Sequence, residues 1–336
     1  MVTERSLSAW ALTPGSAGHE VQCVGVVEAL GLVPAVKRVS PGAPYSWMAP
    51  WGPAAPDRAI APPWPDLVVA SGRQAIPYAR AIRRRSRGRT LVVALQHPAV
   101  PARAFDLVWV NEHDGLAGAN VLRTLTSPHP LTAAKLAAGA AALEAGLGPL
   151  PRPWIGAVLG GTSGAYRFEA ADGAALGRAL AALAGAVGGS VVVTPSRRTG
   201  VEARAALAAE LAAVPSWTWD GEGGENPYFG ILGAADLFVV TCDSVNMLGE
   251  AAFTGRPVFA WPLEGGTRKF QEFHAGLVAT GAMRFLDAPA IAAQVATRSL
   301  AKWDYRPLNA TAVIADRIRA ELARRGRPIG EGGAVA

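Results

Sequence analysis

The segment 236–273 constrains the fold most, because short apolar runs in it alternate with helical patterns. The two runs, 237–240 and 258–261, are each followed by polar or glycine residues and then by a helical pattern. The residues that follow are Thr241, Asp243 and Ser244 after the first run, and Gly265, Gly266, Arg268 and Lys269 after the second. This order predicts strand, turn, helix, strand, turn, helix. It places the polar residues at the carboxyl ends of parallel strands, where ligands bind.

The same alternation recurs in both halves of the chain. Further strands are expected at 8–13, 33–39, 67–70, 91–95, 107–110, 154–159, 191–194 and 217–220. Residues 148–153 form a glycine- and proline-rich linker. The sequence therefore predicts an α/β protein of two Rossmann-like parallel-sheet lobes with a cleft between them. The expected parts are an N-terminal lobe over 1–148, a C-terminal lobe over 153–300, and a helix and tail over 301–336, for which packing on the N-terminal lobe is one option.

The composition limits the partners and the location. The chain of 336 residues carries a formal net charge of +6. This charge suits anionic partners such as nucleotides or an acidic membrane surface, and an ordinary arginine-rich surface explains it equally well. Cys23 and Cys242 lie in apolar surroundings, as reduced cytoplasmic cysteines do. No signal sequence is evident, and 179–196 is interpreted as a helix end, a turn and a strand. The expected location is cytoplasmic, with peripheral attachment at the inner face of a membrane as the alternative.

Several common motifs are absent from the sequence. There is no G-x-x-x-x-G-K loop, D-x-D triplet, C-x-x-C pair or G-x-S-x-G elbow, and the five histidines do not cluster at metal-ligand spacing. We therefore expect no metal ion and no cofactor. Glycine-rich turns follow expected strands at 15–18 and 160–164. Such turns hold phosphate groups in some proteins and only tighten the chain in others.

Candidate catalytic residues lie at the start of the first helix. His19 follows the glycine turn directly, and a helix N-terminus lowers the basicity of an imidazole and orients its ring. It is a candidate general base, with a polar helix-start residue as the alternative. Glu20 is a second candidate for the same role.

Candidate nucleotide-binding residues lie in the second half. The cationic pairs Arg197-Arg198 and Arg268-Lys269 follow strands beside helix N-termini, a placement that suits a diphosphate. Ser244 starts the next helix and could add its hydroxyl. Glu250, six residues on, suits the diol of a ribose, with an exposed helical acid as the alternative.

Two segments of the first half are unusual in composition. Six arginines fall within 80–89, which indicates either a solvated outer face or a patch for acidic lipid or nucleic acid. Aromatic residues are not interleaved with them, so no nucleic-acid partner is expected. The segment 41–65 contains eight prolines and three tryptophans. It is interpreted as an ordered loop packed by its own aromatic residues or as a flexible lid.

Taken together, these residues resemble a known family. The second half is similar to the donor half of two-lobed (GT-B) glycosyltransferases, and the whole chain resembles the mitochondrial-fission, or "elongated mitochondria", family over about residues 8–285. The similar segments are 17–22, 70–73, 96–98, 105–108, 160–161, 194–199, 222–228, 240–244, 250–252 and 268–270. The turn at 14–16 departs from the family pattern, where a basic and acidic turn is expected. Bacterial members are described as glycosyltransferase-like, whereas plant members recruit a dynamin-like protein to mitochondria.

The resemblance implies a metal-independent glycosyltransferase that passes a sugar from a nucleotide-sugar donor to an unknown acceptor, with lipid-linked acceptors among the candidates. The implied donor-binding residues are Gly160, Gly161, Ser196, Arg197, Arg198, Glu225, Asn226, Thr241, Asp243, Ser244, Glu250, Arg268 and Lys269. The implied acceptor-binding residues are Ser71, Gly72, Arg73, Gln96 and His97. Two rival functions use the same fold: a non-catalytic adaptor in membrane or organelle fission, and a two-lobed sugar-nucleotide epimerase.

Overall fold

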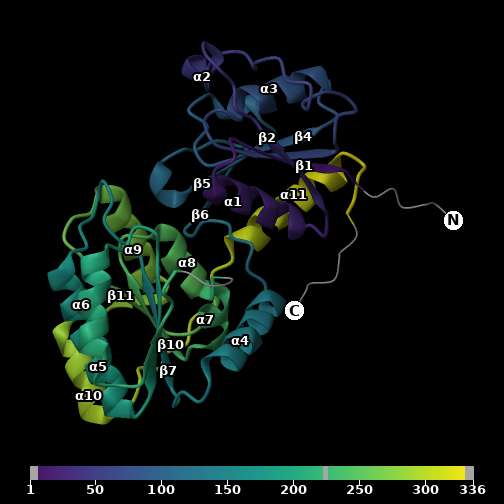
Figure 1. Ribbon diagram of the computed structural model, residues 1–336. Helices are drawn as coiled ribbons and strands as arrows, with labels where there is room; N and C mark the ends of the chain where they lie inside the picture. Colours follow the sequence, from purple (N-terminus) through teal and green to yellow (C-terminus); the bar gives the residue numbers. More distant parts are fainter. Residues whose placement is uncertain (1–6, 222–225, 330–336) are drawn as a thin grey trace. The chain divides into compact units, whose positions relative to one another are not determined.

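The computed structural model describes residues 7–221 and 226–329, and these residues form two α/β units (Figure 1). The first unit contains the described residues up to Pro130 together with those from Asn309 onward. The second unit contains the described residues from Leu131 to Leu308. The chain therefore leaves the first unit after Pro130 and returns to it for its last helix.

The first unit is built on a six-stranded parallel sheet with the strand order β2-β1-β3-β4-β5-β6. The strands are β1 (Ala9–Thr13), β2 (Pro34–Arg38), β3 (Leu67–Ser71), β4 (Leu91–Leu95), β5 (Leu107–Asn111) and β6 (Val121–Thr124). The helices are α1 (Ala17–Glu28), α2 (Tyr45–Met48), α3 (Ile76–Arg85) and α11 (Ala310–Arg324), with 3₁₀ turns η1 (Ala102–Ala104) and η2 (Glu112–Asp114). In Figure 1, α1 and α11 cover one face of this sheet and α3 covers the other.

The side chains of each central strand divide between two cores, because successive residues of a strand point to opposite faces. On β3, Leu67 and Val69 pack with α1 and α11, whereas Val68 and Ala70 pack beneath α3. A sheet buried on both faces needs such continuous apolar strands. The uninterrupted apolar runs in the sequence are explained by this packing.

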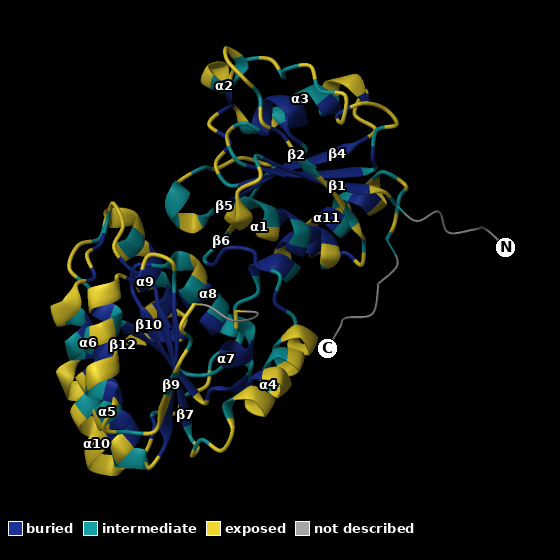
Figure 2. Cartoon of the chain, in the orientation of Figure 1, coloured by how far each residue is buried: buried dark blue, intermediate teal, exposed yellow. Residues whose placement is uncertain are grey.

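The second unit is built on another six-stranded parallel sheet, with the order β12-β11-β10-β7-β8-β9. The strands are β7 (Trp154–Leu159), β8 (Ser190–Pro195), β9 (Ser216–Thr218), β10 (Leu237–Thr241), β11 (Val258–Trp261) and β12 (Met283–Phe285). The helices are α4 (Ala133–Leu147), α5 (Ala170–Val187), α6 (Val201–Leu211), α7 (Tyr228–Ala234), α8 (Val245–Phe253), α9 (Arg268–Ala279) and α10 (Ala288–Thr297). Figure 2 shows the central strands of both units as buried.

One helix of the second unit, α5, is long and apolar enough to cross a membrane by length and composition alone. It instead forms part of the core, where Leu176, Leu180 and Leu183 are buried together with the inward side chains of β8. α5 ends at Gly188, which has the left-handed conformation (φ 64°), and β8 begins two residues later. The prediction of a helix end, a turn and a strand in 179–196 is therefore confirmed.

The end of the first unit differs from the position expected from the sequence, whereas the last helix follows the option stated for it. The helix α4 lies in the second unit and not in an N-terminal lobe over 1–148, because its backbone packs directly on α7. A Cβ atom added to Gly139 would lie 2.9 Å from the backbone nitrogen of Gly230, so only glycine allows this contact. The last helix, α11, joins the first unit, where Ile314 and Ile318 complete the core beside α1.

Candidate functional site

Each sheet contains one pair of neighbouring strands from which the chain leaves in opposite directions. In the first unit the pair is β1 and β3, and in the second unit it is β7 and β10. The loops after such strands diverge and leave a crevice at the carboxyl edge, which is where open α/β sheets bind ligands. Many of the residues selected from the sequence lie in these four loops or at the ends of the elements that flank them: His19, Ser71, Gly72, Arg73, Gly160, Gly161, Asp243 and Ser244.

Asp243, two residues after the end of β10, is the centre of a buried network in the second unit. Its carboxylate is fully buried and lies 2.8 Å from the Arg198 guanidinium. It also accepts hydrogen bonds from the Gly161 N–H at 2.9 Å and from the Thr241 hydroxyl at 2.6 Å. The Thr241 hydroxyl in turn accepts a bond of 2.7 Å from the Gly160 N–H. The network joins the loops after β7, β8 and β10 into one connected edge.

The two glycines of this network serve close packing between the loops. Both of their N–H groups are taken up, by Asp243 and by Thr241, and are not directed at a ligand in this arrangement. A Cβ atom on Gly160 would lie 2.1 Å from Oδ1 of Asp243, and one on Gly161 would lie 2.0 Å from the backbone oxygen of Arg198. The structure thus favours the tight-turn interpretation of Gly160 and Gly161 over direct binding of phosphate.

The loop after β8 is closed by hydroxyl groups. Ser196 donates to the Gly160 carbonyl at 2.7 Å, and the Thr199 hydroxyl donates to the same oxygen. Thr199 was not selected from the sequence, although a threonine three residues after a serine is a spacing at which hydroxyls close a turn. Arg197 and Arg198 are both exposed, and the guanidinium of Arg198 forms an ion pair with Asp243.

Ser244 and Glu250 both lie on or beside α8, as the sequence predicts. Ser244 is the N-cap of the helix, and its Oγ accepts a hydrogen bond from the Met247 N–H at 3.3 Å. Glu250 is half-buried and accepts a hydrogen bond from the Tyr228 hydroxyl at the start of α7. Burial raises the pKa of Glu250 to about 7, against the opposing effect of the Tyr228 hydroxyl. Tyr228 was missed as a site residue, since its contact joins positions that are distant in sequence.

The raised pKa of Glu250 predicts a pH-dependent stability. The folded protein keeps a proton up to about pH 7 that the unfolded chain releases near pH 4.5, so the stabilising contribution is present below pH 4.5 and lost as the pH rises through 7. Relative to a Glu250→Gln variant, the free energy of unfolding should fall by about 2 kcal/mol across this range. Denaturant unfolding of both proteins at several pH values measures the difference. Parallel pH profiles would contradict the assignment.

The loop after β11 depends on two glycines. Gly265 (φ 119°) and Gly266 (φ 104°) adopt left-handed conformations, and the Gly266 N–H donates a bond of 2.7 Å to a carbonyl of the loop after β7. Arg268 and Lys269 follow at the start of α9, and both are exposed. Arg268 lies 2.7 Å from Glu272, one helical turn further on.

The remaining donor candidates lie before α7. The side-chain oxygen of Asn226 accepts a hydrogen bond from the Tyr228 N–H at 3.0 Å, so Asn226 shapes the start of that helix. Glu225 lies outside the described residues. Within 7–221 and 226–329, no group of three histidine, cysteine, aspartate or glutamate side chains is placed to hold a metal ion.

At the crevice of the first unit, His19 contacts Ser71. Nδ1 of His19 lies 2.8 Å from the hydroxyl of Ser71, which is fully buried at the end of β3. A Cβ atom on Gly72 (φ 93°) would lie 2.7 Å from the Pro14 ring and 3.2 Å from the His19 ring, so glycine is required there. Burial lowers the pKa of His19 below its usual 6.5, and the ring is therefore neutral at pH 7. When Nδ1 donates to Ser71, Nε2 is left to accept a proton.

The other first-unit candidates make structural contacts. The bond to Arg38 lowers the pKa of Glu20, which makes it a poor base. Ser71 is buried against His19 and does not reach the surface where an acceptor would bind. Glu20 accepts a hydrogen bond of 2.7 Å from Arg38. Three other candidates also have partners within the first unit: Arg73 donates to the Trp47 carbonyl (3.0 Å), Gln96 donates to Gln22 (3.0 Å), and His97 accepts from the Ala99 N–H (3.0 Å).

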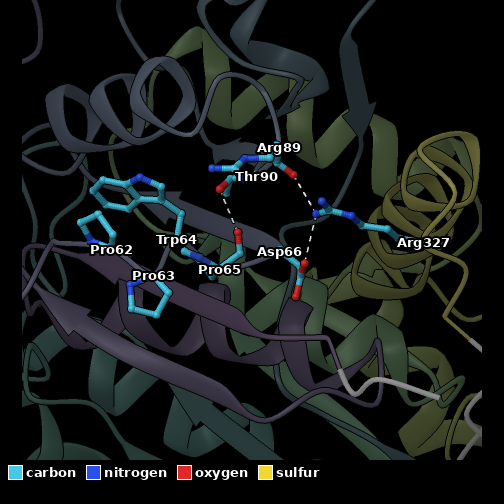
Figure 3. Close-up of a pocket in the computed structure, with 8 residues that line it drawn as sticks. All are labelled: Pro62, Pro63, Trp64, Pro65, Asp66, Arg89, Thr90 and Arg327. Atoms are coloured by element: carbon cyan, nitrogen blue, oxygen red, sulfur yellow. Dashed lines mark hydrogen bonds and ion pairs between the residues drawn. The ribbon is translucent and has the colours of Figure 1, made fainter. Parts of the chain in front are cut away.

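A separate pocket of about 370 Å³ lies at the opposite, amino-terminal edge of the first sheet (Figure 3). Asp66 and Thr90, which line it, directly precede β3 and β4. Arg327 donates to Asp66 at 3.0 Å and to the Arg89 carbonyl at 2.8 Å (Figure 3). These bonds hold the segment after α11 against the amino-terminal edge of the sheet.

Comparison with known proteins places the chain in a family. Residues 17–322 match the family described as "Mitochondrial fission ELM1". The chain belongs to this family. The mitochondrial fission protein ELM1 of Arabidopsis thaliana is 31% identical to it over 286 residues, which cover 78% of this chain. The matched region spans 65% of the length of that ELM1 protein.

Solved structures of low sequence identity share the fold of this ELM1-family chain. The UDP-GlcNAc 2-epimerase from Neisseria meningitidis bound to UDP-GlcNAc aligns with a TM-score of 0.61 at 11% identity, covering 95% of this chain and 100% of that one. The Methanocaldococcus jannaschii UDP-GlcNAc 2-epimerase in complex with UDP-GlcNAc and UDP aligns with a TM-score of 0.52 at 10% identity, covering 94% and 99%. The predicted fold class, two Rossmann-like parallel-sheet units of GT-B type, is confirmed.

Proposed function

We propose that this ELM1-family chain binds a nucleotide sugar through its second unit and transfers the sugar to an acceptor without the help of a metal ion. The main support is the crevice between β7 and β10. The loops at this switch point are already joined to one another by the Asp243 network, and cations lie nearby. The helix that starts there, α8, has a serine at its N-cap and carries a half-buried glutamate. Two UDP-GlcNAc 2-epimerases share this fold, and their structures were solved in complex with UDP-GlcNAc, which supports a nucleotide-sugar ligand.

The diphosphate would bind at the start of α8. The helix N-terminus and the Ser244 hydroxyl supply hydrogen bonds, and Arg197, Arg268 and Lys269 supply positive charge. The buried carboxylate of Asp243 does not oppose an anion there, because Arg198 neutralises it.

The ribose would bind at Glu250. Six residues of helix separate it from Ser244, a rise of about 9 Å, so one nucleotide can span from the helix start to this carboxylate. A ribose diol donates hydrogen bonds to a carboxylate, and in doing so it favours the ionised form of Glu250.

The transfer step assigns a role to His19 of the first unit. Its neutral Nε2 removes the proton of an acceptor hydroxyl, and the acceptor oxygen forms a bond to the anomeric carbon. The bond from that carbon to the nucleotide diphosphate breaks, and the departing diphosphate keeps the electron pair. The loop cations stabilise its charge.

Loss of Glu250 should weaken nucleotide binding. Replacing it by glutamine removes a charge-assisted acceptor, and affinity for the best ligand of a panel of nucleotides and nucleotide sugars should fall about 10- to 100-fold. Thermal-shift screening finds the ligand, and calorimetry measures the affinity. Glu202→Gln, at an exposed position on α6, is the matched control and should bind like the unmodified protein.

Two outcomes would contradict these assignments. A panel in which no nucleotide or nucleotide sugar raises the melting temperature would remove the support for a donor site. Equal affinity in the Glu250→Gln variant and the unmodified protein would place the ribose elsewhere.

Epimerisation of a nucleotide sugar is the second candidate function, favoured by the likeness to the two UDP-GlcNAc 2-epimerases. It needs no acceptor, so conversion of the sugar nucleotide in the absence of any added acceptor would show it. A non-catalytic adaptor, the third reading and the one suggested by the name of the family, predicts neither conversion nor transfer.

A further inference from the structure

The segment around α2 exposes large apolar side chains on an ordered part of the first unit. Trp47 is 74% exposed, Trp51 is 66% exposed, and Met48 between them is 38% exposed. Such side chains are normally covered in a soluble protein, and three of them within five positions form a patch. In Figure 2, α2 is coloured partly as exposed and partly as intermediate.

Hydrogen bonds hold this segment in place. Arg73 donates to the Trp47 carbonyl at 3.0 Å, and Arg80 donates to the Trp51 carbonyl at 3.0 Å. The indole N–H of Trp51 donates to the Ala99 carbonyl at 3.0 Å. These hydrogen bonds fix the positions of the backbone at Trp47 and Trp51, so both tryptophans lie on an ordered segment.

The arginine-rich end of α3 continues the same surface. A hollow of about 410 Å³ is lined by Arg80, Arg83, Arg84, Arg87, Gly88 and Ala104. A second hollow of about 410 Å³ is lined by Trp51, Arg80, Val100, Pro101, Arg103 and Ala104. Because Arg80 and Ala104 line both, the tryptophan side and the arginine side are continuous.

This surface carries positive charges without negative charges among its lining residues to offset them. Arg84, Arg87 and Arg103 are exposed, and the residues that line the two hollows include no carboxylate. The nearby carboxylate of Asp106 is buried and bonded to Arg83 at 2.9 Å and to Arg325 at 3.0 Å. It does not offset the exposed arginines.

We propose that the face formed by Trp47, Trp51, Arg84, Arg87 and Arg103 docks the chain on a lipid bilayer rich in anionic headgroups. Guanidinium groups pair with headgroup phosphates, and tryptophan rings settle at the level of the headgroups. The two kinds of side chain sit side by side, as at a membrane surface, and are not interleaved as in a base-stacking platform. The inference does not depend on glycosyl transfer.

Sedimentation of the full chain with vesicles tests the proposal. Phosphatidylcholine vesicles that contain phosphatidylglycerol should pellet the protein, and vesicles of phosphatidylcholine alone should not. An Arg84→Glu/Arg87→Glu variant should partition about tenfold or more weakly. An Arg306→Glu/Arg317→Glu variant, with the same change of charge at exposed positions elsewhere, should bind like the unmodified protein.

The tryptophans give a second readout. Brominated lipids should quench the fluorescence of the bound chain, and a Trp47→Ala/Trp51→Ala variant should lose that quenching and bind about tenfold more weakly. Circular dichroism should show both variants folded, since the changed side chains are exposed. Three results would overturn the proposal. The first is no sedimentation with anionic vesicles, and the second is an equal loss of vesicle binding in the Arg306→Glu/Arg317→Glu control. The third is vesicle binding that is unchanged in the Trp47→Ala/Trp51→Ala variant and is displaced by an oligonucleotide.

Discussion

A Gly160→Ala substitution should destabilise the second unit by about 3 kcal/mol, because the added methyl group has no room. Its Cβ would lie 2.1 Å from Oδ1 of Asp243. That carboxylate cannot simply move aside, since it pairs with Arg198 and accepts bonds from Gly161 and Thr241. Any shift that relieves the clash weakens the contacts that join three loops. Denaturant unfolding followed by circular dichroism measures the loss.

The same loop supplies the matched control. Gly164 lies four residues further on, and a Cβ atom added there would meet no atom within 4 Å. Gly164→Ala should therefore change the free energy of unfolding by less than about 0.5 kcal/mol. Equal free energies of unfolding for the two variants would contradict the close contact between Gly160 and Asp243.

A His19→Ala variant should lose about 100- to 10,000-fold in kcat, the range expected when a general base is removed. The loss should leave the affinity for the donor unchanged, since His19 belongs to the first unit and the proposed donor site to the second. In the unmodified protein kcat/KM should be level near neutral pH and should fall on acidification below pH 6.5, where the ring takes up a proton. The assay is transfer from the nucleotide sugar found in the binding screen.

Under the proposed mechanism, Ser71 should affect transfer only through its contact with His19. Ser71→Ala removes the partner of Nδ1, so kcat should fall while the KM for the donor stays the same. Nuclear magnetic resonance of the imidazole nitrogens should show a changed tautomer or pKa of His19 in this variant. His113→Asn, in the 3₁₀ turn η2, is the histidine control, and its kcat should equal that of the unmodified protein. A His19 resonance that is indifferent to Ser71 would refute the positioning role.

The central strands and the switch-point loops could be predicted from the sequence, because local pattern determines them. The strand positions followed from uninterrupted apolar runs such as those of β3 and β10. The edge strands β6 and β12 were missed, since each is short and only partly buried and so lacks an apolar run. The predicted helix after Ser244 was found at α8, where serine supplies the N-cap.

The partners of the site residues could not be predicted, because they depend on contacts between distant segments. The sequence suggested Arg198 as a ligand for phosphate, and nothing local indicates that it pairs with Asp243, 45 positions away. Glu20 and Tyr228 show the same limitation, since the partner of Glu20 is on β2 and that of Tyr228 is on α8. The alanine-rich α4 was assigned to the wrong unit, because small side chains fit many partners equally well.

The position of α11 has a consequence for synthesis on the ribosome. The face of the first sheet that α1 covers is completed by Ile314, Ile318 and Leu322 of α11, which are translated after the whole second unit. Domains generally fold as they emerge, so the second unit can reach its native state while the first still exposes part of its apolar face. The nascent chain must keep that face from aggregating until its last helix leaves the exit tunnel.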